Sequence, residues 1–208
     1  TQNNVWLPLF KNREVVQFDI GDALPRRGNR YTRSIARSIL ALMGWQIDGE
    51  FPNLSKIVLA GAPHTSNWDM VLGMVVIWAL GLEVFWLAKK SIFRGPRGRL
   101  MYWLGGIPVN RQVSQGLVDQ TISEYKRREK YLLIILPSGT RTKGAQWKAG
   151  FYHIAIGAEV PILPVKFDYG NKVMAFGPLF QPTGDVAADI ARLHGHFVGT
   201  QGKNWRQV

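Results

Sequence analysis

Residues 57–69, IVLAGAPHTSNWD, place a histidine and an aspartate directly after a short apolar run. The run at residues 57–60 predicts a buried strand, and the uncharged run at residues 70–82 predicts a buried helix. His64 and Asp69 therefore lie where a strand turns into a helix. This order is typical of the α/β class, whose parallel strands are buried on both faces.

His64 and Asp69 are a candidate general-base pair, because an imidazole that takes a proton on one nitrogen needs an acceptor for its other N–H. On one continuous helix they would lie about 140° apart, at roughly 100° per residue, and would point to different faces. They can meet only if His64 lies in the loop and Asp69 in the first helical turn. Thr65, Ser66 or Asn67 could then cap the helix. The alternative is that Asp69 only caps the helix and His64 is an ordinary loop histidine.

The rest of the chain continues the alternation of strands and helices. Strands are predicted at residues 45–47, 56–60, 84–87, 131–136, 161–167 and 172–176. Helices are predicted at residues 70–82, 114–130, 147–158 and 185–197, and the Gly, Pro and Arg residues of 94–99 predict a loop. We expect one α/β domain with a mostly parallel central sheet flanked by helices. Residues 1–45 would form an N-terminal arm and helix, and residues 46–208 the main domain, within one compact unit.

The chain is strongly basic, since 26 Lys and Arg residues against 14 acidic residues give a formal charge of +12. This charge predicts attraction to a polyanion such as nucleic acid, anionic lipid or an acidic carrier protein. Residues 26–43 combine arginines with an apolar stripe and end at Gly44. The arginines are 26, 27, 30, 33 and 37, and the stripe is Ile35, Ile39, Leu40, Leu42 and Met43. This pattern predicts a basic amphipathic helix that either lies on an anionic membrane or packs its apolar side on the core.

Several classes of protein are disfavoured by what the sequence lacks. It has no cysteine, which excludes a disulfide framework and thiolate chemistry. The N-terminal residues do not have the pattern of a signal peptide, and the run at 70–82 is shorter than the roughly 18 residues of a membrane span. His194 and His196 have no convincing third ligand, so no metal site is expected. We expect a cytoplasmic protein bound peripherally to the inner face of a membrane.

Four blocks of sequence support a more specific interpretation. The segment HTSNWD at residues 64–69 resembles the His-x4-Asp motif of the glycerolipid acyltransferase family, which includes the bacterial 1-acylglycerol-3-phosphate acyltransferases. Three further blocks match the family in the same order: GGIPVNR at 105–111, SGTR at 138–141 and VPILPV at 160–165. Four blocks in order over residues 64–165 make the resemblance specific.

The resemblance implies an acyltransferase of phospholipid biosynthesis. The enzyme would move a fatty acyl group from acyl-CoA or acyl-carrier protein to a hydroxyl of a lysophospholipid such as 1-acylglycerol-3-phosphate. His64 would be the general base and Asp69 would orient it, with no metal and no organic cofactor. The acceptor would be bound by Asn67, Arg111, Ser138, Gly139, Thr140 and Arg141, of which the two arginines match the family's phosphate-binding residues. The expected partners are the lysolipid, the acyl donor and a membrane surface, and no nucleic acid is expected.

Acyl transfer also needs hydrogen-bond donors for the tetrahedral oxyanion. The backbone N–H groups around Ser66 and Asn67 are one candidate set, and the loop of Ser138 and Thr140 is another. The sequence does not choose between them.

Two positions depart from the family pattern. The third block usually begins with Glu, whereas this chain has Ser138, whose hydroxyl cannot hold a charge. Asn110 stands where the family often has Asp. Two alternatives therefore stay open: acylation of a different lipid hydroxyl, such as that of a lyso-aminolipid, and a non-catalytic basic protein that binds lipid or nucleic acid. Binding to nucleic acid would weaken steeply with salt and would not depend on an acyl donor.

Overall fold

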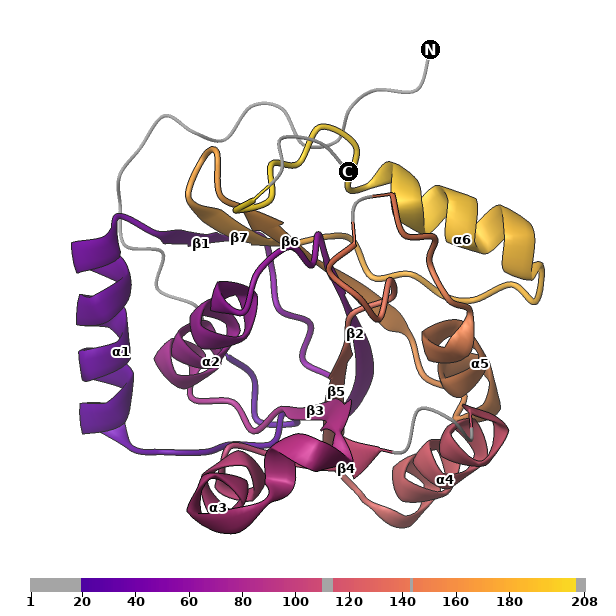
Figure 1. Ribbon diagram of the computed structural model, residues 1–208, viewed down its shortest axis with the longest axis horizontal. Coiled ribbons are helices and arrows are strands. Elements are labelled where there is room, and N and C mark those ends of the chain that lie inside the picture. The colour runs from indigo at the N-terminus through magenta and orange to yellow at the C-terminus, as the bar shows by residue number, and fades with distance from the viewer. Residues whose placement is uncertain (1–19, 110–113, 143, 205–208) are drawn as a thin grey trace.

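The computed structural model describes residues 20–109, 114–142 and 144–204. Its strands form one sheet in the order β1-β7-β6-β2-β5-β3-β4 (Figure 1). They are β1 (Gln46–Asp48), β2 (Lys56–Ala62), β3 (Phe85–Lys89), β4 (Gly106–Val109), β5 (Tyr131–Ile135), β6 (Ile162–Asp168) and β7 (Val173–Phe176). All neighbouring strands pair in parallel except β6 and β7, which pair antiparallel. The prediction of a single α/β domain with a mostly parallel sheet is confirmed.

Helices cover both faces of the sheet. They are α1 (Arg30–Met43), α2 (Trp68–Leu80), the 3-10 helix η1 (Lys90–Phe93), α3 (Gly95–Trp103), α4 (Ser114–Arg127), α5 (Gly150–Gly157) and α6 (Val186–Gly195). Figure 1 shows α1, α2 and α3 on one side of the sheet and α4, α5 and α6 on the other. Among the described residues, no helix is long and apolar enough to cross a membrane.

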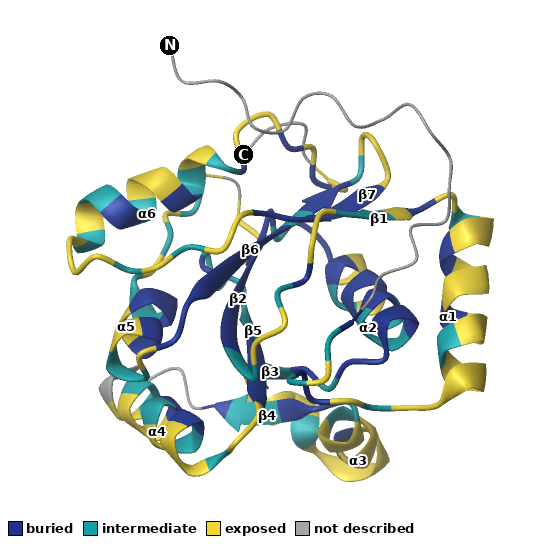
Figure 2. Cartoon of the chain, turned by 180° about the vertical axis from the view of Figure 1, so that it is seen from behind, coloured by how far each residue is buried: buried dark blue, intermediate teal, exposed yellow. Residues whose placement is uncertain are grey.

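The side chains of the central strand β2 pack alternately into two hydrophobic cores, one on each face of the sheet. Ile57 and Leu59 pack in the cluster that contains α1 and α2, whereas Val58 and Ala60 pack in the cluster that contains α4, α5 and α6. Side chains alternate between the two faces of a strand, so an unbroken apolar run is what a strand covered on both sides requires. Figure 2 shows the buried strands between helices whose outer faces are exposed.

The carboxyl ends of three neighbouring strands meet at one edge of the sheet. β6, β2 and β5 are adjacent and parallel. The loop with His64 follows β2, the loop with Ser138 follows β5, and Tyr169 follows β6 directly. Open α/β sheets bind their ligands at this edge, so the topology gathers segments that are far apart in the sequence.

Residues 94–99 were predicted to form a loop, and this prediction is wrong because α3 begins at Gly95. Pro96 lies in the first turn of the helix, where the absence of its N–H removes no intrahelical bond. Gly98 lies inside the helix, where a Cβ atom would come within 2.1 Å of the Phe93 carbonyl oxygen. Gly95 and Pro96 therefore lie at the start of a helix, and Gly98 allows a close contact with the backbone of Phe93.

The strand β4 and the start of α5 also differ from the predictions. β4 was not predicted as a strand, because it is short and contains Pro108. It is an edge strand, where a proline is tolerated because one side of the strand needs no ladder bond. α5 begins at Gly150 and not at residue 147, because Trp147 belongs to the preceding loop and packs against Phe151 and Phe197.

The basic N-terminal helix forms within the predicted range. Asn29 caps its start by accepting hydrogen bonds from the N–H groups of Tyr31 and Thr32, and Gly44 ends it with a φ of 71°, in the left-handed region. Its buried residues are Ala36 and Leu40. The exposed apolar side chains of α1 are Tyr31, Ile35, Ile39 and Leu42. Most of the predicted apolar stripe therefore faces outward instead of packing on the core.

Candidate active site

His64 and Asp69 meet in the geometry that their spacing requires. His64 lies in the loop after β2 and Asp69 in the first turn of α2, and His64 Nδ1 is 3.0 Å from Asp69 Oδ2. The side chain of His64 is 19% exposed and that of Asp69 is fully buried. An ionised carboxylate can only accept, so the partner assigns the proton to Nδ1 and leaves the lone pair on Nε2. His64 thus has the tautomer that a general base needs.

Asp69 accepts four hydrogen bonds. Its Oδ2 also accepts from the backbone N–H groups of Thr65 at 2.8 Å and Ser66 at 2.9 Å, and its Oδ1 accepts from the Tyr169 hydroxyl at 2.8 Å. Burial raises the pKa of Asp69, but the hydrogen bonds from His64, Ser66, Tyr169 and Thr65 outweigh burial and bring the pKa below its usual value. Asp69 is therefore ionised at neutral pH. It both caps the loop N–H groups and holds the imidazole.

The start of α2 agrees in part with the predicted capping, because Ser66 Oγ accepts a hydrogen bond from the N–H of Trp68 at 3.2 Å. Asn67 is the N-cap residue, but its side chain makes no capping bond. Its amide oxygen instead accepts a hydrogen bond from the guanidinium of Arg141, which lies 74 positions away. The N–H of Ser66 donates to Asp69 Oδ2 at 2.9 Å, and the choice among the candidate oxyanion donors stays a prediction.

The loop after β5 is held together by its own hydroxyl groups. Ser138 Oγ donates to the carbonyl of Thr140 at 2.9 Å, and the hydroxyls of Thr140 and Thr142 lie 3.0 Å apart. Gly139 has a φ of 61°, a conformation that favours glycine. The turn carries Arg141 to Asn67 at the start of α2. Arg111 lies outside the described residues, so its predicted place in the site stays a prediction.

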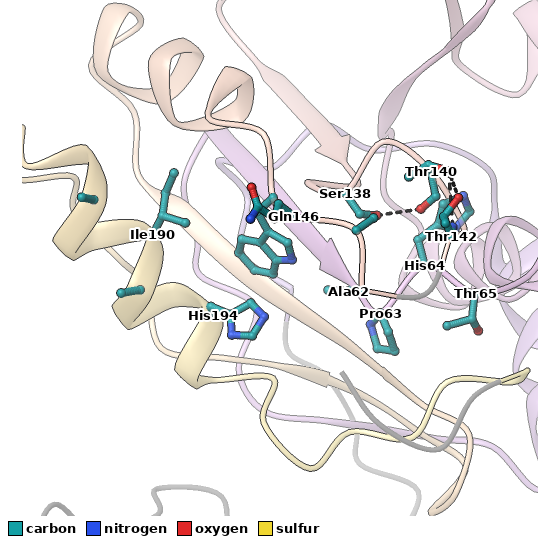
Figure 3. Close-up of a pocket in the computed structure, with 15 residues that line it drawn as sticks. Ala62, Pro63, His64, Thr65, Ser138, Thr140, Thr142, Gln146, Ile190 and His194 are labelled. Carbon is teal, nitrogen blue, oxygen red and sulfur yellow. Dashed lines mark hydrogen bonds between the residues drawn. The ribbon is translucent and has the colours of Figure 1, made fainter.

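A cavity of about 720 Å³ opens beside His64. Figure 3 shows His64 with Thr140 and Thr142 at one end, and Ile190 and His194 of α6 at the other. The residues near the polar end are His64, Thr65, Ser138, Thr140 and Thr142, and the apolar wall includes Trp147, Ala187, Ile190 and Ala191. The cavity therefore places His64 and several hydroxyl groups at one end and the apolar side chains of Trp147 and α6 at the other.

The sequence did not predict the contribution of α6. His194 was considered above only as a metal ligand, but it lines the cavity with its ring centroid 5.3 Å from that of Trp147. Ala187 and Ala191 are four positions apart, so they share one face of the helix. This pair of small residues is the sequence signal that could have indicated a helix bordering a cavity.

The last described segment also contacts the motif loop, which the sequence did not predict. The backbone N–H of Lys203 donates to Thr65 Oγ1 at 2.9 Å, and the side-chain amide of Asn204 donates to the carbonyl of Thr65 at 2.8 Å. Lys203 Nζ lies 4.2 Å from the ring centroid of Trp68, which is half exposed. The segment thus fixes the loop between His64 and α2 from outside.

Comparison with known proteins adds to this geometry. A family model described as Acyltransferase matches residues 48–168. The 1-acyl-sn-glycerol-3-phosphate acyltransferase of Escherichia coli is 32% identical over 111 residues, which cover 50% of this chain and 44% of that protein. The 1-acyl-sn-glycerol-3-phosphate acyltransferase beta of Homo sapiens is 33% identical over 132 residues, or 61% of this chain and 47% of that protein. The chain thus spans about half the length of the relatives it matches.

A solved structure shows the same fold. The 1-acyl-sn-glycerophosphate (LPA) acyltransferase PlsC from Thermotoga maritima superimposes with a TM-score of 0.56 at 13% identity, covering 80% of this chain and 75% of that one. The range of the family model contains all four blocks of the predicted resemblance. The resemblance is therefore confirmed, and the chain belongs to the acyltransferase family.

Proposed function

We propose that this protein is an O-acyltransferase that moves a fatty acyl group from the thioester of acyl-CoA or acyl-carrier protein to a hydroxyl of 1-acylglycerol-3-phosphate. The observation that carries the proposal is the hydrogen-bonded pair of His64 and Asp69 at the mouth of a largely apolar cavity. Membership of the acyltransferase family and the printed activity of the Escherichia coli and human relatives support the reaction and the acceptor.

The reaction follows from the tautomer of His64. Nε2 takes the proton of the acceptor hydroxyl while the oxygen attacks the thioester carbonyl carbon. Asp69 stabilises the imidazolium that forms. The tetrahedral intermediate then collapses, the carbon–sulfur bond breaks, and the leaving thiolate receives the proton from His64. The acceptor itself is the nucleophile, so the mechanism uses no acyl-enzyme and requires no metal or organic cofactor.

We place the phosphate group of the acceptor next to Arg141, beside Asn67. A guanidinium offers a planar fork that matches phosphate oxygens, and the hydrogen bond to Asn67 holds Arg141 in place before the ligand arrives. Arg111 is proposed as the second phosphate ligand on the strength of the sequence motif. Ser138 lines the cavity with an uncharged hydroxyl that donates to Thr140. An acceptor with a different head group is therefore the alternative that the substrate panel below must test.

The apolar chamber between Trp147 and α6 is proposed to hold the acyl chain. Ala187 and Ala191 leave room there because they have the smallest apolar side chains. We expect Ala191→Phe to fill part of the chamber and to lower kcat/KM for long-chain donors at least tenfold more than for short-chain donors. Each buried methylene is worth about 0.8 kcal/mol, so a chain displaced by a few methylenes loses this much binding.

The chain-length effect is measured by comparing acyl donors of increasing length with wild type and Ala191→Phe. Ala188→Phe is the matched control, because Ala188 is on the same helix but does not line the cavity. Equal loss of activity for all chain lengths in Ala191→Phe would contradict this assignment of the chamber.

The enzyme is further proposed to work peripherally at a membrane, on its inner face. The exposed apolar side chains of α1 are joined by three on α3, namely Leu100, Tyr102 and Trp103. Arg27, which lies three residues before α1, contacts α3, since its guanidinium lies 4.9 Å from the ring centroid of Trp103. Both helices lie on the same side of the sheet (Figure 1). Apolar side chains among arginines are suited to an anionic lipid surface, where aromatic rings settle at the head groups.

We expect the double variant Ile35→Asp/Leu42→Asp to lose most of its binding to vesicles of phosphatidylcholine and phosphatidylglycerol in a sedimentation assay. Both side chains are more than half exposed, so the change should not disturb the core. Val198→Asp is the matched control, because Val198 is also exposed but follows α6 on the other side of the sheet. Equal vesicle binding by the double variant and the control would rule out this face.

The proposed reaction is tested with radiolabelled acyl-CoA and acyl-carrier protein against lysophosphatidate, other lysophospholipids and a lyso-aminolipid. We expect acyl transfer to lysophosphatidate to be the fastest. Faster transfer to the aminolipid would indicate that the site with Ser138 binds a head group other than that of lysophosphatidate. Complete absence of product with every donor and acceptor would refute the enzymatic proposal.

A further inference from the structure

Tyr169 reaches the pair of His64 and Asp69 from the end of β6, the strand next to β2. It directly follows β6, exactly one residue beyond the range of the family model, and lies 100 positions from Asp69. Its hydroxyl donates to Asp69 Oδ1 at 2.8 Å. The other three hydrogen bonds to this carboxylate all end on Oδ2. Tyr169 therefore donates to Oδ1, whereas the three donors of the motif loop, His64, Thr65 and Ser66, all donate to Oδ2.

The position of Tyr169 is fixed independently of Asp69. Its ring packs edge-on against Trp45 with centroids 4.9 Å apart, and its backbone N–H donates to the carbonyl of Gln201 at 2.8 Å. Burial raises the pKa of Tyr169, and the hydrogen bond to Asp69 and the charge of Asp69 raise it further, far above its usual value. The hydroxyl thus stays protonated and donates throughout the physiological range.

We propose that Tyr169 is a positioning residue for the general base, which fixes the plane of the Asp69 carboxylate so that Oδ2 stays on His64 Nδ1. The inference rests on the proposed function, because it assigns Tyr169 a role in the action of His64. A carboxylate that is bound through one oxygen can rotate about its terminal torsion, whereas bonds to both oxygens stop this rotation. Tyr169 also satisfies an oxygen that would otherwise be buried without a partner.

The groups that face Asp69 or lie near it can be named for the residues that the structure describes. His64 faces it from the loop after β2, and Tyr169 faces it from the end of β6. Farther out, Arg141 is bound to Asn67 and Lys203 lies over Trp68, the two residues that precede Asp69. Removal of the Tyr169 hydroxyl leaves these cations in place, so a changed pH profile in the variant reports the Asp69–His64 pair.

Tyr169→Phe is expected to lower kcat about tenfold and to leave KM for donor and acceptor unchanged, because Tyr169 is not among the residues that line the cavity. The acid limb of kcat/KM should move to higher pH. Without the donor on Oδ1, the negative charge of Asp69 is less neutralised and attracts the proton on the neighbouring imidazole more strongly. A merely structural role would lower activity equally at all pH values.

Tyr125→Phe is the matched control. Its hydroxyl is also buried and donates at 2.8 Å, but to the carbonyl of Ile57 at the start of β2, away from the cavity. We expect this variant to lose thermal stability as Tyr169→Phe does, without any shift of the acid limb. A shift of the same size in both variants would overturn the proposal.

A double-mutant cycle with Asp69→Asn tests whether Tyr169 acts through Asp69. In that background Tyr169→Phe should change kcat less than twofold, and a full tenfold loss would contradict the inference. If Tyr169→Phe does not fold, 3-fluorotyrosine at position 169 keeps the ring and makes the hydroxyl a stronger donor. The acid limb should then move to lower pH, and an unmoved limb would overturn the proposal.

The two proposals fail in distinguishable ways. If His64→Ala keeps its activity, the proposed function itself is wrong. If His64→Ala is inactive while Tyr169→Phe retains the wild-type kcat and pH profile, the general base stands and only the role of Tyr169 is refuted.

Discussion

Replacing His64 with alanine is expected to lower kcat for acyl transfer by about 10²- to 10⁴-fold, the range that general-base catalysis contributes. The imidazole is held by Asp69 at 3.0 Å and lines the cavity, so its removal leaves the acceptor hydroxyl without a group to take its proton. The measurement is the steady-state rate with the best donor and acceptor from the substrate panel. Binding of the acyl donor should be nearly unchanged, since the proposed role of His64 is to act on the acceptor hydroxyl.

The control for this variant is His153→Ala. His153 is an exposed residue of α5 that does not line the cavity, so its loss should leave kcat at the wild-type value. Thermal unfolding of both variants should match wild type within a few degrees. Near-normal turnover by a folded His64→Ala protein would mean that another group accepts the proton.

Asp189→Ala is expected to produce the largest loss of stability, about 3 kcal/mol of unfolding free energy. Asp189 is fully buried on α6, where it accepts from the Tyr152 hydroxyl at 2.7 Å and from the backbone N–H of Thr183 at 2.6 Å. Alanine would leave these donors buried without their acceptor. For a chain of this size the loss corresponds to a fall in Tm of roughly 6 to 12 °C, measured by calorimetry.

This stabilisation depends on pH with a defined sign. Burial raises the pKa of Asp189, but the hydrogen bonds from Thr183 and Tyr152 outweigh burial and lower the pKa below its usual value of 3.8. A carboxyl with a lowered pKa stabilises the fold above the unfolded value, and this contribution is lost as pH falls through the folded value. The difference in stability between wild type and Asp189→Ala should therefore shrink in acid.

Asp185→Ala provides the comparison for Asp189. Asp185 is an exposed carboxylate at the N-cap of the same helix, where it accepts from the N–H of Ala188 at 3.0 Å. Loss of a cap costs about 1 kcal/mol. Because α6 forms a wall of the cavity, Asp189→Ala should also lose activity before it unfolds. An Asp189→Ala protein as stable as Asp185→Ala would show that the buried carboxylate does not anchor the helix.

The elements that the sequence predicted well are those with a clear local pattern. The apolar run of β2, the helix that follows it and the capped basic helix α1 all formed near their predicted positions. The pattern failed at α3 and β4, where glycine and proline have roles set by neighbouring chain segments. At Gly98, for example, a side chain would clash with the carbonyl oxygen of Phe93. The periodicity of apolar residues does not predict that contact.

The sequence by itself determined the fold class and the family resemblance, because both rest on patterns that are local: alternating apolar runs and four short motifs. It also restricted a contact between His64 and Asp69 to one arrangement, with His64 in the loop and Asp69 in the first helical turn. Only the tertiary structure decided that Tyr169 reaches Asp69, that Arg141 reaches Asn67 and that α6 forms a wall of the cavity. These contacts join segments that meet because β6, β2 and β5 are neighbours in the sheet. The order of strands is a property of the whole packed chain, since it depends on which apolar faces can be buried together.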